Sequence, residues 1–366
     1  MTPNRVAYVV NVFPKLSETF IAGELAELRR RGVELRVLSL RQPTEPLRHD
    51  FVARARLDKI TCYQPAQFAS LLREFAPDLL HAHFATEPTA AARDLAKDLG
   101  VPFLFTAHGY DIRRKAPADF AERAAAARAV VTVSNANARC IAGSFGVPLD
   151  RIHVIPCGVD TDRFRPADGR GAGGHDTASR TTVPFIVNVA RHVRVKNLGL
   201  LLEACALLRR RNTRFRCVLV GDGPLRGELQ EKSRRLGLQS CLKFTGALKQ
   251  AEVINWWRRA SVAALTSDNE GMPVCLMEAA ACGVPAVATA VGGVPELVQD
   301  GVTGLLTRPG DAADLASALA TILANPRFGF RLGRAARERV EQQFSVRRQV
   351  NGLLGLWSRL LAEQRR

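Results

Sequence analysis

The stretch VAALTSDNEGMPVCLMEAAACGVPAVA, residues 262–288, carries the clearest secondary-structure pattern in this chain of 366 residues. Its apolar run 262–265 predicts a strand, the small and apolar residues 274–282 predict a helix, and 286–288 predict a second strand. A strand, a helix and a strand in this order form the unit from which parallel sheets are built. The stretch therefore predicts an α/β fold.

The same alternation continues through the chain on both sides of that stretch. In the first half we expect strands at 6–12, 35–40, 79–83, 102–107, 129–134 and 152–155, and helices at 18–31, 67–74, 89–98, 120–127 and 137–145. In the second half we expect further strands at 185–190, 216–220, 242–244 and 305–306, and helices at 198–210, 225–236, 252–259, 312–323 and 328–343. This spacing indicates parallel sheets with helices on both faces.

The length of the chain favours two domains. Residues 166–183 include a run rich in Gly, Ser and Arg, which is typical of a loop or linker. We therefore expect an N-terminal domain over 1–165, a C-terminal domain over 184–345 and a final amphipathic helix over 346–366. Ligands of such sheets bind at the carboxyl ends of the strands, so we expect the site in a cleft between two facing sheets.

The composition excludes several classes of protein. Apolar residues make up 47% and charged residues 24%, as in globular proteins. The 8 cysteines lack the spacing of a zinc or redox motif, which predicts reduced thiols in a cytoplasmic protein. A net charge of +17 suits phosphorylated substrates or an anionic membrane surface, although an Arg-rich background composition would also produce it. No basic run is interleaved with aromatic residues, so nucleic acid is not expected as a partner.

The N-terminal segment bears on the location of the protein. The apolar run 6–12 is short, contains Asn11 and is followed closely by Pro14, unlike a signal peptide. No apolar stretch approaches the roughly 20 residues that span a bilayer. We expect a cytoplasmic protein, and peripheral association with the inner face of the cytoplasmic membrane remains open.

Two carboxylates, Glu270 and Glu278, flank a turn and the start of a helix. If most of the interval is helical, they lie on the order of 10 Å apart. The catalytic pair of a retaining hydrolase needs roughly 5 Å, whereas the larger distance suits the ribose and the sugar of one nucleotide-sugar. The turn, Gly271-Met272-Pro273, exposes backbone N–H groups that favour a diphosphate. Two solvated Glu residues on an exposed helix are the alternative.

Two cations lie in the loop that follows the strand at 185–190. Arg191 offers a fork of donors to phosphate oxygens, and Lys196 offers a point charge. Cations placed there would stabilise a departing diphosphate without a metal ion. A basic surface loop is the alternative. In the next strand-to-helix turn, Gly221 begins Gly-Asp-Gly-Pro, which either contacts a nucleotide base or forms an ordinary turn.

Polar residues also follow the strands of the first half. His108 comes directly after the strand at 102–107, where it can bond a sugar hydroxyl or handle a proton, and Tyr110 and Asp111 could meet an acceptor. A histidine packed within a loop is the alternative for His108. His81 and His83 share one face of a strand, but no cluster of Cys or carboxylates accompanies them, so no metal is expected.

The loop before the first helix offers two further candidates. Ser17 is a plausible cap for the helix at 18–31. Ser17 and Glu18 also lie where a helix N-terminus could contact a phosphate or an acceptor.

Together these residues resemble the retaining glycosyltransferases of family 4, which have the GT-B fold. The resemblance covers nearly the whole chain and rests on an ordered set of motifs: Arg191 with Lys196, Glu270 with Glu278, Val159-Asp160-x-x-x-Phe164, Gly292-Gly-Val-Pro-Glu296 and Asp300-Gly-x-x-Gly304. The segments 13–20 and 81–84 look most like the colanic acid and amylovoran type of exopolysaccharide glycosyltransferase. The resemblance implies two Rossmann-like domains whose parallel sheets face each other across a cleft, with a C-terminal helix.

The resemblance implies a role for each matched residue. Arg191 and Lys196 would hold the diphosphate, Glu278 the ribose, and Glu270 the donor sugar. Backbone N–H groups near the sugar and phosphate would come from the segment Gly271, Met272, Pro273 and Val274, and His108 would lie near the reacting carbon. The family retains anomeric configuration, usually without a metal or other cofactor. One departure is that Pro14-Lys-Leu-Ser17-Glu18 replaces the Gly-Gly loop of many members.

These expectations favour an enzyme that moves a hexose from a UDP- or GDP-sugar to a saccharide, often a lipid-linked one, in the synthesis of exopolysaccharide or cell-surface glycan. A nucleotide-sugar epimerase is an alternative, but it would need a catalytic acid pair that the sequence does not offer outside the Glu270 region. A non-catalytic carbohydrate-binding or assembly subunit is another, and the presence of Arg191, Lys196, Glu270 and Glu278 argues against it.

Overall fold

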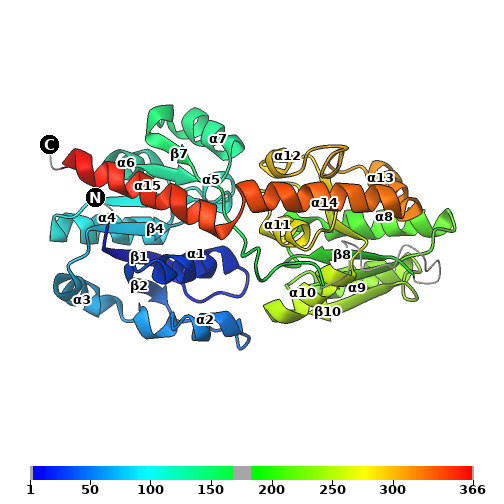
Figure 1. Cartoon of the computed structure of the whole chain (residues 1–366), viewed down its shortest axis with the longest axis horizontal. Coiled ribbons are helices and arrows are strands. Elements are labelled where there is room, and N and C mark those ends of the chain that lie inside the picture. Colours follow the sequence, from blue (N-terminus) through cyan, green and yellow to red (C-terminus); the bar gives the residue numbers. More distant parts are fainter. Residues whose placement is uncertain (1–2, 168–182, 365–366) are drawn as a thin grey trace. The chain divides into compact units, whose positions relative to one another are not determined.

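The computed structural model describes residues 3–167 and 183–364, so most of the expected linker at 166–183 lies outside the described residues. The chain divides into two compact units (Figure 1). Unit 1 combines residues 1–158 with 346–366, and unit 2 comprises residues 159–345. The expected N-terminal domain therefore ends earlier than residue 165, and the final helix belongs to unit 1.

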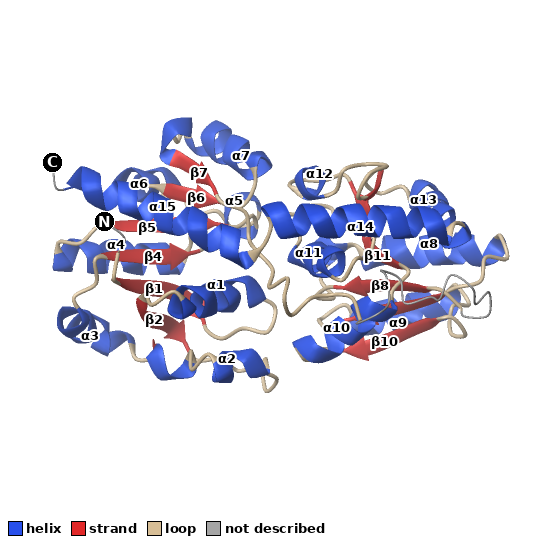
Figure 2. Cartoon of the chain, viewed as in Figure 1, coloured by secondary structure: helices blue, strands red, loops and turns tan. Residues whose placement is uncertain are grey.

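Unit 1 contains a seven-stranded parallel sheet in the order β3-β2-β1-β4-β5-β6-β7 (Figure 2). The strands are β1 (Arg5–Val12), β2 (Glu34–Arg41), β3 (Thr61–Cys62), β4 (Leu79–His83), β5 (Phe103–Ala107), β6 (Val130–Thr132) and β7 (Ile152–Val154). The helices are α1 (Thr19–Arg30), α2 (Asp50–Arg54), α3 (Phe68–Phe75), α4 (Glu87–Leu99), α5 (Tyr110–Arg113), α6 (Phe120–Ala126), α7 (Asn135–Phe145) and α15 (Val346–Gln364).

Alternation along β1 divides the core of unit 1 into two layers, because successive side chains of a strand point to opposite faces. Tyr8 packs in the layer formed with α1, α2 and α15. Val9 packs in the layer formed with α3, α4, α6 and α7. Trp357 of α15 is completely buried in the first layer, which explains why the last helix completes unit 1 rather than unit 2.

Unit 2 contains a six-stranded parallel sheet in the order β10-β9-β8-β11-β12-β13. The strands are β8 (Phe185–Val189), β9 (Arg216–Val220), β10 (Leu242–Gly246), β11 (Val262–Leu265), β12 (Ala286–Thr289) and β13 (Gly304–Thr307). The helices are α8 (Leu198–Arg210), α9 (Arg226–Arg235), α10 (Gln250–Arg259), α11 (Val274–Ala281), α12 (Val294–Leu297), α13 (Ala312–Ala324) and α14 (Pro326–Gln343).

The strand order places a topological switch point in each sheet. In unit 1 the order reverses between β1 and β4, and in unit 2 between β8 and β11. Loops that leave the carboxyl ends of two such strands diverge to opposite sides and leave room for a ligand. The structure thus confirms two Rossmann-like units with parallel sheets, and it identifies the loops in which a site is expected.

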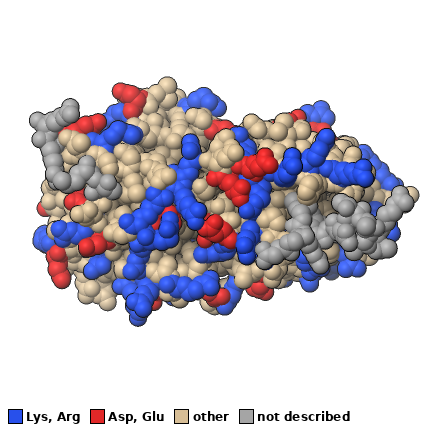
Figure 3. All heavy atoms as spheres, viewed as in Figure 1, with Lys and Arg blue, Asp and Glu red and all other residues tan. Residues whose placement is uncertain are grey.

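Surface charge and hydropathy also bear on the expected location. None of the helices in the described part of the chain is long and apolar enough to span a bilayer. On the face drawn in Figure 3, Lys and Arg side chains are spread over both units and are interspersed with Asp and Glu. The positive charge on this face is therefore distributed rather than confined to a single patch.

Candidate active site

In unit 2, the residues expected to hold a diphosphate and a sugar lie in the two loops at the switch point. Arg191 and Lys196 follow β8, whereas Glu270 follows β11. Two hydrogen bonds join the loops: the backbone N–H of Asp268 donates to the carbonyl of Val195 at 2.9 Å, and the Asn197 amide donates to the Asp268 carboxylate at 2.8 Å. The loops are therefore held together as one surface before any ligand binds.

Lys196 and Glu270 form an ion pair at the centre of this surface. The Lys196 Nζ lies 2.6 Å from Glu270 Oε1, and the hydroxyl of Ser267 donates to the same oxygen at 2.6 Å. The Glu270 side chain is 9% exposed and that of Lys196 is 19% exposed. An ammonium group has three donor hydrogens, so the pair leaves donors of Lys196 for a phosphate oxygen.

The backbone around Glu270 is closely packed. Its carbonyl oxygen accepts a hydrogen bond from the N–H of Gly293 at 3.0 Å. A Cβ added to Gly292 would lie 1.9 Å from that carbonyl oxygen, and Gly292 has a φ of +51°. A glycine at 292 is thus needed for the loop after β12 to approach Glu270.

Arg191 and Gly221 occupy different environments. Arg191 is exposed, as expected for a cation that meets a phosphate from solvent. Gly221 has a φ of +129°, and a Cβ added there would lie 2.0 Å from the carbonyl oxygen of Ala190. Close packing between the loops after β8 and β9 therefore accounts for Gly221 without any ligand.

The start of α11 gathers several of the expected residues. The N–H groups of Gly271 and Met272 have no hydrogen-bond acceptor among the described residues, and Pro273 directly precedes the first residue of the helix, Val274. Burial raises the pKa of the Cys275 thiol to about 12, and the charges of Lys196, Glu270 and Glu278 all act on it. The expected cation and both carboxylates therefore surround the first turn of α11.

Glu278 is the most strongly perturbed carboxyl group in this unit. It is 7% exposed, and among the described residues its carboxylate accepts only a long hydrogen bond, 3.5 Å, from the indole N–H of Trp257. Burial raises the pKa of Glu278 to about 7, although the hydrogen bond from Trp257 acts in the opposite direction. A carboxylate with so few donors is suited to accept hydrogen bonds from ligand hydroxyl groups.

The raised pKa of Glu278 predicts a dependence of stability on pH. Because the folded pKa of about 7 exceeds the ordinary value of 4.5, the unfolded chain releases this proton first as pH rises. As pH rises from about 4.5 to 7, this group therefore lowers the free energy of unfolding progressively, by about 3 kcal/mol in total. In Glu278→Gln this component should vanish, so urea unfolding at pH 5 and pH 8 should show a smaller loss of stability than in the wild type. The control is Glu228→Gln, a substitution of an exposed residue. If the two variants lose the same amount of stability between pH 5 and pH 8, the raised pKa of Glu278 is contradicted.

In unit 1, two residues expected from the sequence, His83 and His108, are linked at the ends of β4 and β5. The Nδ1 of His83 lies 2.9 Å from the Nε2 of His108, within hydrogen-bonding distance. The half-buried ring of His108 packs against the rings of Phe20 and Phe84, with centroid distances of 4.7 and 4.6 Å. Burial, with the neighbouring His83, lowers the pKa of His108 well below its ordinary value, so the ring is neutral near pH 7.

Asp111 shapes the loop that carries His108. Its carboxylate accepts hydrogen bonds from the backbone N–H groups of Ala85, His108 and Gly109, at 2.8, 2.9 and 2.9 Å, and it has no exposed surface. Burial raises the pKa of Asp111 despite the opposing effect of these hydrogen bonds. The expected contact between Asp111 and an acceptor is therefore wrong, because the carboxylate positions the loop instead.

The remaining expected residues of unit 1 also differ in part from expectation. Ser17 does not cap α1, because the residue at the cap position is Glu18, whose side chain makes no capping hydrogen bond. Glu18 instead pairs with Lys15 at 2.6 Å. Tyr110 is 56% exposed and free to meet a ligand. His83 has no exposed surface, so it cannot contact an acceptor directly.

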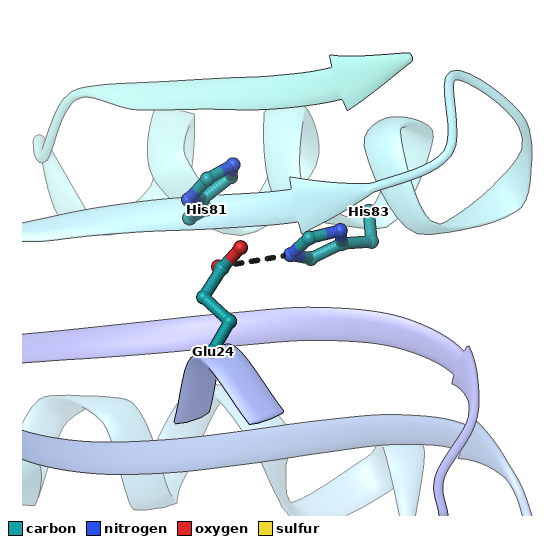
Figure 4. A group of neighbouring side chains, drawn as sticks. All are labelled: Glu24, His81 and His83. Carbon is teal, nitrogen blue, oxygen red and sulfur yellow. Dashed lines mark hydrogen bonds and ion pairs between the residues drawn. The ribbon is translucent and has the colours of Figure 1, made fainter. Parts of the chain in front are cut away.

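A cluster that the sequence did not predict lies behind His108. Glu24 of α1 points toward His81 and His83 of β4 (Figure 4), and the ligand atoms of the three residues lie within 4.8 Å of one another. Glu24 Oε1 is 2.6 Å from the Tyr8 hydroxyl and 3.3 Å from His83 Nε2. This set of donors could coordinate a metal ion, but hydrogen bonds already use both nitrogens of His83.

A second residue that the sequence analysis passed over is His192, which follows β8. Its ring is completely buried, and neither ring nitrogen has a hydrogen-bond partner among the described residues. Burial lowers the pKa of His192, so the ring is neutral. A Cβ added to Gly223 would lie 2.6 Å from the His192 carbonyl oxygen. The backbone of His192 therefore packs closely against the turn after β9.

Comparison with known proteins agrees with these features. A family model described as glycosyl transferases group 1 matches residues 175–339, and one described as Glycosyltransferase Family 4 matches residues 17–163. A D-inositol 3-phosphate glycosyltransferase from Saccharomonospora viridis is 31% identical over 308 residues, which cover 78% of this chain and 70% of that protein. Alignments to two Streptomyces proteins of the same name cover 43% and 46% of those proteins.

The amylovoran biosynthesis glycosyltransferase AmsK of Erwinia amylovora is 29% identical over 296 residues, which cover 77% of this chain and 70% of that protein. Among solved structures, that of HepE from Anabaena in complex with UDP-glucose matches with a TM-score of 0.79 at 19% identity, covering 96% of this chain and 98% of that one.

Two Rossmann-like units with parallel sheets, and cations beside carboxylates at a switch point, define a glycosyltransferase of the GT-B fold that uses a nucleotide-sugar. The chain belongs to glycosyltransferase family 4.

Proposed function

We propose that this protein transfers a hexose, with retention of anomeric configuration, from a UDP- or GDP-sugar to a saccharide acceptor in the synthesis of exopolysaccharide or cell-surface glycan. The observation that carries the proposal is the Lys196–Glu270 pair at the switch point of unit 2. The pair supports the proposal because it would supply a cation for the diphosphate and a carboxylate for sugar hydroxyls from adjoining loops. AmsK, named for amylovoran biosynthesis, supports the kind of pathway.

The residues divide the work of the proposed reaction. The acceptor oxygen forms a bond to the anomeric carbon while the bond to the diphosphate breaks, and the leaving group takes the bonding electron pair. Arg191 and Lys196 stabilise the charge that develops on the diphosphate. The acceptor attacks from the face that the diphosphate leaves, so the departing phosphate oxygen can take the hydroxyl proton. The products are a glycoside and a nucleoside diphosphate.

The donor half of the site is assigned to unit 2. We propose that the N–H groups of Gly271 and Met272, which lack acceptors among the described residues, and the first turn of α11 bond the phosphate and sugar. Glu278 is assigned to the ribose hydroxyls, which would supply the donors that its carboxylate lacks. Because the two cations provide the positive charge, we propose that transfer needs neither a metal ion nor another cofactor.

We test the donor and the need for metal by thermal unfolding of the full chain with UDP-, GDP-, ADP- and dTDP-sugars, each with and without EDTA. A binding ligand stabilises the folded state in proportion to RT ln(1 + [L]/Kd), so a donor at 100 times its Kd contributes about 2.7 kcal/mol. We expect stabilisation by UDP- or GDP-sugars that EDTA does not reduce. If no nucleotide-sugar stabilises the protein, the proposal loses its donor site. Stabilisation that EDTA abolishes would contradict metal independence.

We further propose that the acceptor is lipid-linked and that the protein works in the cytoplasm at the inner face of the membrane. The net charge of +17 supports this, since anionic lipids attract basic surfaces. The protein should sediment with liposomes that contain anionic lipid at low salt and be released at high salt. Preferential binding to neutral liposomes would exclude this mode of association.

A further inference from the structure

We infer that Glu24 and His83 are positioning residues that hold His108 in a single tautomer, with its Nε2 protonated and its Nδ1 presented as a hydrogen-bond acceptor to the substrate. The inference rests on the proposed transfer reaction and on the expected role of His108 as a hydrogen-bond partner of a hydroxyl of the donor sugar. It is carried by a chain of hydrogen bonds within unit 1 that runs from Gly158 through Gln349, Glu24 and His83 to His108, and each member of this chain fixes the next.

The chain of hydrogen bonds begins at a group that can only be a donor. The backbone N–H of Gly158 can only donate, and it donates to Oε1 of Gln349 at 2.7 Å. The other end of that amide, Nε2, must then be the donor, and it lies 2.5 Å from Oε2 of Glu24. Gln349 is buried, so water does not compete for either end. The Oε2 atom of Glu24 is therefore an acceptor.

The other oxygen of the Glu24 carboxylate determines which nitrogen of His83 is protonated. Oε1 of Glu24 accepts from the Tyr8 hydroxyl at 2.6 Å and lies 3.3 Å from His83 Nε2, which the inference makes the donor. The inference includes a neutral His83 ring: with its proton on Nε2, this ring has its lone pair on Nδ1. His83 Nδ1 must therefore accept, and its partner at 2.9 Å is Nε2 of His108.

His108 is consequently the donor in that last hydrogen bond. With its proton on Nε2, the lone pair of the neutral ring lies on Nδ1, which has no hydrogen-bond partner among the described residues. The rings of Phe20 and Phe84 both pack against His108, with centroid distances of 4.7 and 4.6 Å. His108 thus presents an acceptor, suited to a sugar hydroxyl, rather than a donor.

The same carboxylate makes the inference testable by one substitution. In Glu24→Gln the new side chain has one oxygen and one NH₂ group. Because the Gln349 NH₂ group can only donate, the new oxygen should face it, and the new NH₂ group should face His83 Nε2. His83 would then accept on Nε2 and carry its proton on Nδ1, so His108 would accept on Nε2 and carry its proton on Nδ1. The tautomer of His108 should therefore reverse.

The experiment is ¹⁵N NMR of the full chain labelled on its histidines, since ¹⁵N shifts distinguish protonated from unprotonated ring nitrogens. His108 is assigned by the signal that His108→Ala removes. We expect protonation on Nε2 in the wild type and on Nδ1 in Glu24→Gln. Tyr8→Phe is the matched control, because it removes another bond to the same oxygen and should keep the wild-type tautomer. If Glu24→Gln does not fold, protonation of His108 on Nδ1 in the wild type would still overturn the inference.

Turnover supplies the second readout, with UDP-glucose or GDP-mannose as donor according to which stabilises the protein. In Glu24→Gln we expect kcat to fall about 100-fold, as for loss of a preorganised hydrogen bond in the transition state, while the KM for the donor changes less than threefold. A reversed tautomer with unchanged kcat would overturn the positioning role. Metal-shifted histidine signals with stoichiometric bound zinc would instead show that Glu24, His81 and His83 hold an ion, and would overturn it too. Failure of the proposed function is distinct, because neither donor would then stabilise the wild type while the tautomers could still be observed.

Discussion

Glu270→Ala is expected to lower kcat/KM for glycosyl transfer by about 10²–10³-fold, since preorganised electrostatic groups contribute on this order. Glu270 holds Lys196 through a bond of 2.6 Å and also accepts from Ser267. Alanine would release the ammonium group from its position for the phosphate and remove the acceptor for sugar hydroxyls. Both losses act on binding and on the transition state. Steady-state kinetics with the donor identified by thermal unfolding would measure the effect.

Unit 2 should remain folded in this variant. The Lys196 side chain is 19% exposed, so water can solvate the unpaired ammonium group, and we expect a cost of about 1–3 kcal/mol in the free energy of unfolding. The control is Glu228→Ala on the exposed side of α9, which should retain the wild-type rate. Near-full turnover in Glu270→Ala would show that the donor site has been assigned to the wrong residues.

His108→Ala is expected to lower kcat about 100-fold with little change in nucleotide binding. The residues assigned to the nucleotide all lie in unit 2, whereas His108 lies in the loop after β5 of unit 1. The variant should therefore show the wild-type thermal stabilisation by UDP or GDP while turnover is lost. Glu122→Ala on the exposed face of α6 is the control. Equal losses of nucleotide binding and turnover would instead indicate that His108 supports the donor site.

Several regular elements could be predicted closely from the sequence. The bounds of β4, β9, β11 and α8 agree with the expected ranges, because an apolar run or a clear periodicity marks each of them. The elements α2, β3, α5 and α12 were not predicted, since neither a period nor a continuous apolar run distinguishes them from the loops around them. The expected division of the chain missed that α15 packs on β1 and α1, because an amphipathic pattern reveals that a helix has a buried face but not what buries it.

The buried polar residues were harder to predict than the exposed loops. The residues expected to act at the ends of β4, β5, β8 and β11 lie there, because the carboxyl ends of parallel strands can be located from the strands alone. Glu24 was missed, yet a signal existed: it lies between Ile21 and Leu28 in the apolar stripe of α1. Gln349 lies in the same way between Val346 and Leu353 in α15. Polar residues within an apolar stripe need hydrogen-bond partners, but the sequence does not show that Glu24 and Gln349 are partners of each other.

Unit 1 is assembled from both ends of the chain, whereas unit 2 is one continuous segment. During synthesis, residues 159–345 therefore leave the ribosome before α15 does, and unit 2 can fold while unit 1 still lacks Trp357 and Gln349. Until α15 arrives, the Glu24 carboxylate has no amide donor and one layer of the unit 1 core is open to water. Unit 2 can thus fold first, and the hydrogen bond from Gln349 to Glu24 can form only after α15 has been synthesised.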